Sequence, residues 1–289
     1  MDLPFTLSTE PPVTVRPMDR DELGIAIDLA AAEGWNPGLH DAETFRAADP
    51  GGFFALEHDG EVIGTVSVAR YGDRFAFGGL YVLRPEYRGR GIGYSLQQEF
   101  TLPFAGSRNL GIDGVFAMQS RYETAGFVYA YRNLRFEGIG GGTAPPGVVP
   151  LGEVPFEAVA GYDRPFFPEP REVFLRAFLT QPDAVGFAAA DAAGDIAGYG
   201  LARRCRVGYK IGPLFADTPE IAERLYGALS AAVPGEPLFL DAPEPNAEAL
   251  ALAARHDMRE VFGTARMYSR SVPPMPIDRI YGITTFELG

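Results

Sequence analysis

The sequence is poor in cysteine and histidine. A single cysteine, Cys205, excludes a disulfide within the chain and is expected in a strand, and three scattered histidines lack the spacing of a structural zinc site. Long uncharged apolar runs are also missing: the first residues show no signal-peptide pattern, and the alanine-rich stretch 184–193 is interrupted by Asp191. We therefore expect a cytoplasmic protein that uses no metal.

Basic residues are scarce as well. Lysine and arginine total 25 against 38 aspartates and glutamates, a formal net charge of −13. This deficit argues against nucleic acid or an anionic membrane as a partner, because both are bound mainly through lysine and arginine. At 289 residues, 46% of them hydrophobic, the chain has room for one large or two ordinary soluble domains.

The most informative stretch is Arg88–Gly93, which reads Arg-Gly-Arg-Gly-Ile-Gly. The apolar run 77–83 before it predicts a strand that Pro85 ends, and the run 95–100 after it begins a helical pattern. Glycines allow the main chain to approach a ligand closely, and the start of the following helix attracts negative charge. The stretch therefore predicts a cradle for a phosphate group.

The turn has other interpretations. It could be a solvated turn with two surface arginines. A Rossmann fingerprint needs an acidic residue about twenty positions further on, at the end of the next strand; Asp113 has the distance but precedes that strand. A Walker loop would end in Gly-Lys-Ser/Thr, which is absent. An acidic protein that binds an anionic coenzyme needs a local basic patch, which Arg84, Arg88 and Arg90 supply.

Two motifs in this order resemble the GNAT family of acyl-CoA N-acetyltransferases. The signature strand and its glycine loop correspond to residues 80–85 and 88–93. The second strand corresponds to 114–118, and Tyr122–Phe127 matches the Tyr-x-x-x-Gly-Phe motif that follows it. The resemblance covers residues 13–136 and implies a mixed α/β fold, with a mostly antiparallel sheet flanked by helices.

The remaining elements of this first part follow the order that the family implies. An Asp-Gly pair between alternating apolar runs is a strong hairpin signal, and it occurs here at Asp59-Gly60. The elements expected around it are a strand at 13–17, helices at 19–34 and 40–48, the hairpin strands 53–57 and 62–68, and a last strand at 127–136.

A second, degenerate copy of the fold is expected after a Gly/Pro-rich linker. We place a coenzyme-binding domain at 1–137, the linker at 138–148 and a GNAT-like domain at 149–289. In the second copy the loop reads Asp217-Thr218-Pro219-Glu220, without glycine and with two carboxylates, and Ala253 stands where the family has its tyrosine. This domain is therefore expected to bind no coenzyme.

The resemblance assigns roles to particular residues. It implies acetyl-CoA as co-substrate and Tyr122 as the general acid that protonates the leaving thiolate. It implies coenzyme contacts from Tyr81, Val82, Leu83, Arg88, Gly89, Arg90, Gly91, Ile92 and Gly93, and acceptor contacts from Trp35 and Asn36. Structural roles compete with these: Tyr122 or Trp35 as a core aromatic, and Asn36 as a turn former.

No residue is assigned as the base. The signature strand carries Phe77-Gly78-Gly79 where many relatives keep a glutamate. Glu99 and Glu123 are expected to be solvated helix charges, and His40 and His58 surface residues. A water relay, a group of the second domain, or the tail 283–288 could serve, although a terminal strand that rejoins the sheet would also explain that tail.

Three functions from different classes remain open on sequence. The leading one is an acetyl-CoA-dependent N-acetyltransferase that acts on a primary amine of a small molecule or of a protein. The second is a non-catalytic acyl-CoA-binding sensor, and the third is an interaction protein that docks partners through its second domain. A homodimer is compatible with all three.

Overall fold

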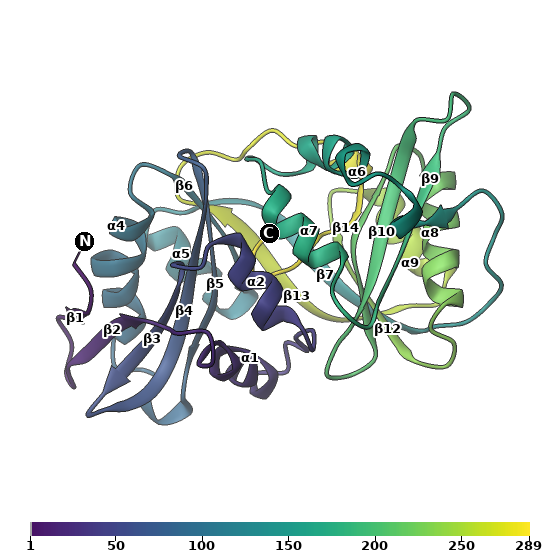
Figure 1. Ribbon diagram of the computed structural model, residues 1–289. Coiled ribbons are helices and arrows are strands. Elements are labelled where there is room, and N and C mark those ends of the chain that lie inside the picture. The colour runs from purple at the N-terminus through teal and green to yellow at the C-terminus, as the bar shows by residue number, and fades with distance from the viewer. Residues whose placement is uncertain (1) are drawn as a thin grey trace.

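The computed structural model describes residues 2–289 and shows a twisted sheet that runs through both halves of the chain, with helices on its faces (Figure 1). The strands up to the linker are β1 (Phe5–Leu7), β2 (Val13–Pro17), β3 (Phe53–His58), β4 (Glu61–Tyr71), β5 (Phe75–Leu83), β6 (Asn109–Val115) and β7 (Val128–Ile139). Those after it are β8 (Val149–Pro150), β9 (Ala184–Ala190), β10 (Ile196–Arg204), β11 (Tyr209–Ala216), β12 (Pro237–Pro243), β13 (Arg259–Tyr268) and β14 (Ile280–Gly282). The predicted α/β class with a mostly antiparallel sheet is confirmed.

The helices include the two predicted at 19–34 and 40–48. They are α1 (Leu23–Ala32), α2 (Asp41–Ala48), α3 (Ile92–Ser95), α4 (Leu102–Ala105), α5 (Gln119–Thr124), α6 (Phe156–Asp163), α7 (Glu172–Leu179), α8 (Pro219–Ala231) and α9 (Ala247–Arg255). The helix after the glycines begins at Ile92 rather than Ser95, because Gly91 makes the left-handed turn immediately before it (φ 78°). None of the helices in residues 2–289 is long and apolar enough to cross a membrane.

The two halves exchange one strand each, β7 and β13. The sheet order is β1-β2-β3-β4-β5-β6-β13-β7-β12-β11-β10-β9-β8, with β14 added to β11. Strand β13 therefore lies between β6 and β7, and β7 pairs with β12. Each predicted domain is completed by a strand that belongs, in sequence, to the other one.

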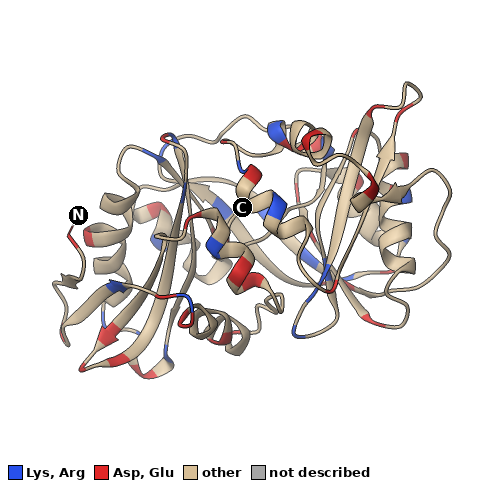
Figure 2. Ribbon diagram, in the orientation of Figure 1, with Lys and Arg blue, Asp and Glu red and all other residues tan. Residues whose placement is uncertain are grey.

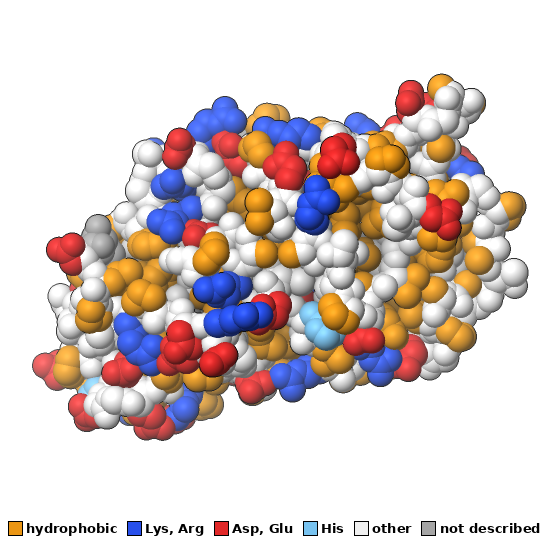
Figure 3. All heavy atoms as spheres, viewed as in Figure 1, with side chains coloured by type: hydrophobic (Ala, Val, Ile, Leu, Met, Phe, Trp, Pro, Cys, Tyr) orange, Lys and Arg blue, Asp and Glu red, His pale blue; other side chains and the backbone are white. Residues whose placement is uncertain are grey.

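Most charged side chains are spread over the surface. Acidic and basic residues are interspersed on both halves (Figure 2), and on the face in Figure 3 they alternate with hydrophobic side chains. The net charge of −13 is therefore not gathered into one acidic patch on that face.

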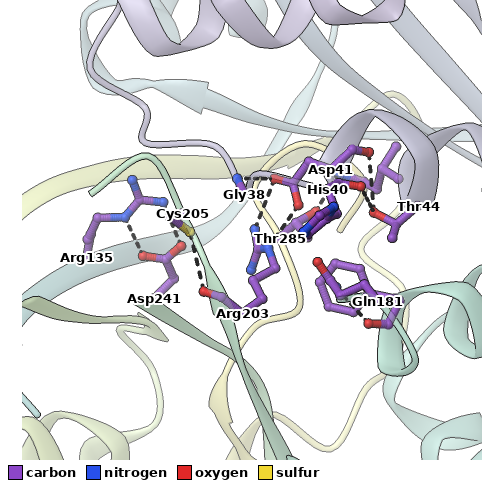
Figure 4. Close-up of polar contacts among 12 residues, drawn as sticks. Gly38, His40, Asp41, Thr44, Arg135, Gln181, Arg203, Cys205, Asp241 and Thr285 are labelled. Carbon is purple, nitrogen blue, oxygen red and sulfur yellow. Dashed lines mark hydrogen bonds and ion pairs between the residues drawn. The ribbon is translucent and has the colours of Figure 1, made fainter. Parts of the chain in front are cut away.

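A smaller set of charges is buried, and two ion pairs hold the exchanged strands. Arg135 on β7 lies opposite Asp241 on β12 and donates two hydrogen bonds of 2.7 and 2.8 Å to its carboxylate (Figure 4). Arg266 on β13 lies opposite Asp113 on β6 and does the same at 2.9 and 2.6 Å. All four side chains are buried. Bidentate pairing of this kind fixes the register of each exchanged strand.

The tail departs from the prediction of a terminal strand. Only Ile280–Gly282 forms a strand, β14, while residues 283–288 are irregular and buried against helices and strands of both halves. Glycines permit this path. A Cβ at Gly212 would lie 2.5 Å from the Ile283 carbonyl oxygen, and one at Gly79 only 2.2 Å from the Glu287 carbonyl oxygen. In Figure 1 the C-terminus accordingly lies in the middle of the molecule.

Replacing Arg266 by methionine tests the clamp on β13. We expect Arg266→Met to lower the free energy of unfolding by about 3–5 kcal/mol, because it leaves the buried Asp113 carboxylate without its cation. Urea denaturation measures the loss.

Two further variants separate this effect from a general one. The double variant Asp113→Leu/Arg266→Met should recover much of the loss, since no unpaired charge is then left buried between β6 and β13. Arg20→Met, which breaks an exposed ion pair with Glu43, should cost less than about 1 kcal/mol. A small loss in Arg266→Met would contradict the assigned clamp.

Candidate active site

The signature strand β5 leaves part of its edge free. It pairs in parallel with β6 only from Phe75 to Gly78, while the opposite edge of β6 pairs with β13. The register with β4 shifts between Thr65 and Ser67, which forms a bulge around Leu80 (φ 47°). The Thr65 hydroxyl donates a 2.8 Å hydrogen bond to the Leu80 carbonyl oxygen and holds this bulge. The main chain after Leu80 can therefore face a ligand.

The glycine loop forms an open cradle beside this edge. Gly89 and Gly91 both have left-handed φ angles, 76° and 78°, and no atom lies within 4 Å of where their Cβ atoms would be. Helical structure then runs without a break from α3 through a π-helical turn at Leu96–Thr101 into α4. Arg88 is held in place by Glu33 (2.5 Å) and by the Leu83 carbonyl oxygen (2.8 Å). These features fit a diphosphate at the start of a helix.

A cavity of about 660 Å³ joins the cradle to the free edge of β5. Most predicted coenzyme residues line it: Tyr81, Val82, Leu83, Arg88, Gly89, Gly91, Ile92 and Gly93. Arg90 does not; its guanidinium packs on the Tyr87 ring and bonds to the Glu86 carbonyl oxygen. Four lining residues, Ser67, Gln97, Thr264 and Glu287, have a buried polar atom without a hydrogen-bond partner within residues 2–289. A polar ligand such as pantetheine could pair with these atoms.

Tyr122 reaches the same cavity from α5. Its ring packs edge-on against Phe127, with 5.8 Å between centroids, and against Gly114, where a Cβ would come within 2.6 Å of the ring. Burial raises the pKa of the phenol, so it stays protonated at neutral pH, as a proton donor must. The Tyr122 ring is thus held by its packing against Phe127 and Gly114, and the residue also lines the cavity.

The two predicted acceptor residues differ in position. Trp35 lines the cavity, and its carbonyl oxygen accepts a 2.7 Å hydrogen bond from Arg135. Asn36 is not among the lining residues. Its amide makes two 2.9 Å hydrogen bonds with the backbone of Val207 and so joins the two halves.

The structure adds residues that local motifs did not indicate. Phe262 and Thr264 come from the exchanged strand β13, and Phe286 and Glu287 come from the tail; all four line the cavity. The rings of Phe262 and Phe286 lie 5.9 Å apart and both pack against the Arg135 guanidinium. The lack of a carboxylate in 77–79 was the one sequence signal that a group from elsewhere was needed.

The corresponding region of the second half is filled by the chain itself. Strand β14 pairs with β11 at Leu214 and Phe215, where the free edge of β5 has its counterpart. Thr218 caps α8 through the Ile221 amide, and Asp217 is paired with Arg279. Ala253 is fully buried. No group of His, Cys, Asp and Glu side chains within residues 2–289 is arranged to hold a metal ion.

Comparisons with known proteins agree with this geometry. The model of the acetyltransferase (GNAT) family matches residues 22–102, and that of an acetyltransferase (GNAT) domain matches 159–282. Holothin acyltransferase of Pseudoalteromonas sp. (strain SANK 73390) is 30% identical over 96% of this chain and 94% of its own length. The chain belongs to the GNAT family of acyltransferases. Its two halves are two GNAT domains, as the sequence predicted.

Solved structures share the fold. A protein from Pyrococcus horikoshii, provisionally assigned as an acetyltransferase, superimposes with a TM-score of 0.82 at 24% identity and covers 96% of both chains. A tandem GNAT protein from the clavulanic acid biosynthesis pathway gives a TM-score of 0.63 at 15% identity over 91% of this chain and 99% of its own. The GNAT enzyme described here therefore shares its two-domain arrangement with solved proteins.

A charged side chain in the cradle should exclude the coenzyme. We expect Gly91→Glu to raise the dissociation constant of acetyl-CoA by about 100-fold or more, because a carboxylate would lie where the diphosphate is expected. Isothermal titration calorimetry measures the change.

Gly235→Glu is the matched control for this variant. Gly235 has the same φ of 78° and equally open surroundings but lies in the second half, away from the cavity. The Gly235→Glu substitution imposes the same backbone strain and adds the same charge as Gly91→Glu. Equal losses of acetyl-CoA binding in the two variants would therefore contradict the assigned cradle.

Proposed function

We propose that this GNAT protein transfers an acetyl group from acetyl-CoA to a primary amine, with Tyr122 as the general acid. One observation carries the proposal: a single cavity is lined by the glycine cradle, the free edge of β5 and Tyr122. Transfer needs an anion site, donors for the carbonyl oxygen and a proton source at short range, and these three features can supply them.

A small-molecule acceptor is favoured over a protein by the walls of the cavity. Trp35, Phe262 and Phe286 give it an aromatic surface between the two halves, and its volume is in the range of small-molecule sites. The relative in Pseudoalteromonas is named as a holothin acyltransferase, so holothin is one acceptor to test. We therefore propose an amine whose body packs against aromatic side chains.

Each group has a defined task in this proposal. The N–H groups after the Leu80 bulge polarise the thioester carbonyl, and the cradle from Arg88 to Gly93 holds the diphosphate. Tyr122 donates its proton to the sulfur as the C–S bond breaks. The aromatic wall holds the amine on the far side of the carbonyl.

Removal of the Tyr122 hydroxyl tests the reaction and the acid together. With acetyl-CoA and holothin, followed by a panel of aromatic and aliphatic amines, the wild-type protein should release free thiol. Tyr122→Phe should lower kcat by about 100-fold or more while KM for acetyl-CoA changes little. Tyr129→Phe, at a partly exposed tyrosine of β7, is the control. A wild-type protein that releases no thiol with any amine would refute the proposal.

Truncation of Trp35 tests the acceptor wall. We expect Trp35→Ala to raise KM for the amine about tenfold, because the acceptor loses an aromatic face, and to leave the acetyl-CoA dissociation constant unchanged. Trp35→Phe keeps an aromatic ring, so its KM for the amine should lie between that of the wild type and that of Trp35→Ala. Steady-state kinetics at saturating acetyl-CoA would distinguish these outcomes; an unchanged KM for the amine would place the acceptor elsewhere.

A further inference from the structure

The tail brings a carboxylate to the cavity. Phe286 and Glu287 line it, and Glu287 is only 3% exposed. Its Oε2 atom has no hydrogen-bond partner among residues 2–289. A buried carboxylate oxygen in that condition is costly, so its position calls for a functional reason.

The other carboxylates of the cavity are engaged. Within the described chain, three carboxylates line it: Glu33, Asp113 and Glu287. Glu33 is paired with Arg88, and Asp113 accepts hydrogen bonds from Arg266 and Asn133. No histidine of residues 2–289 is among the lining side chains. Glu287 is therefore the one lining carboxylate that is free to accept a proton from a ligand.

Glu287 is also held next to the reacting part of the strand. Its carbonyl oxygen would be 2.2 Å from a Cβ at Gly79, which directly precedes the Leu80 bulge. The tail thus crosses β5 where the strand itself has no carboxylate. Leu288 is fully buried and the Arg171 guanidinium contacts Thr284 (3.0 Å), which fixes the tail on both sides of Glu287.

The charges that face Glu287 come from four elements. Lys210 on β11, Arg203 on β10 and Arg135 on β7 oppose the effect of burial, and Asp41 on α2 adds to it. Arg203 and Arg135 are already paired with Asp41 and Asp241 (Figure 4). On balance, burial raises the pKa of Glu287 above its usual value, which brings it closer to neutral pH.

We propose that Glu287 is the general base of the transfer, an inference that rests on the proposed acetyltransferase function. Its carboxylate takes one proton from the amine as the N–C bond forms and the C–S bond breaks, while Tyr122 gives its proton to the sulfur. Glu287 then returns its proton, through water, to the Tyr122 phenolate. The products are the amide and free CoA, and both side chains regain their starting states.

Kinetics of Glu287→Gln test this role with acetyl-CoA and the fastest amine of the panel. We expect kcat to fall by about 100-fold or more and the acetyl-CoA dissociation constant to stay within about twofold. The wild-type kcat/KM should fall as pH drops below the pKa of Glu287, and this limb should vanish in Glu287→Gln. Glu287→Asp should keep the limb at an intermediate rate, and Glu123→Gln, an exposed glutamate on α5, should match the wild type.

Thermal unfolding supplies a second readout. Because the pKa of Glu287 is raised in the folded state, its contribution to stability is fully present below the unfolded pKa of about 4.3 and is lost as pH rises through the folded pKa. Glu287→Gln should therefore melt at a higher temperature than the wild type at pH 7 but not at pH 4.

The outcomes separate the two proposals. An active wild type with an equally active Glu287→Gln and the same pH profile would overturn the role of Glu287 and leave the acetyltransferase function standing. A wild type that transfers nothing to any amine would overturn both.

Discussion

The pairing of β7 with β12 and of β13 with β6 is the constraint on which the rest of the molecule depends. Each exchanged strand carries an arginine to a buried aspartate of the other half, Arg135 to Asp241 and Arg266 to Asp113. A slip of one residue would turn both guanidinium groups to the opposite face of the sheet and leave charges unpaired. Because β13 also provides Phe262 and Thr264, this register positions part of the wall of the cavity.

The two GNAT domains share one architecture but differ at the edge of one strand. In the first, β5 parts from β6 after Gly78, and a free strand edge faces the cavity. In the second, β11 parts from β12 after Ile211, and β14 occupies the equivalent edge. From β14 the chain continues directly into the cavity of the first domain. One continuous segment thus occupies the edge of β11 in the second domain and lines the cavity of the first.

Local signals predicted most of the fold and many of the residues that line the cavity. The Asp59-Gly60 hairpin, the glycine cradle and Tyr122 all depend on residues close together in sequence, and they lie as expected or line the cavity. The exchange of β7 and β13 could not be predicted from sequence. The alternation of apolar and polar residues along each strand is compatible with pairing in either half. From sequence, the tail 283–288 is only one of several possible sources of a base. That Glu287 in particular reaches the cavity depends on the distant Gly79, which leaves room for the tail.

The exchange also bears on how the protein is made. Arg266 and Asp113 are 153 positions apart, so the first GNAT domain lacks an internal strand of its sheet until β13 has left the ribosome. Contacts of such long range are slow to form, because a large loop must close before they yield any stabilisation. Folding of the two domains is therefore expected to be one cooperative event late in synthesis. Until residues 283–288 are in place, a newly made chain lacks the part of the cavity wall that Phe286 and Glu287 form.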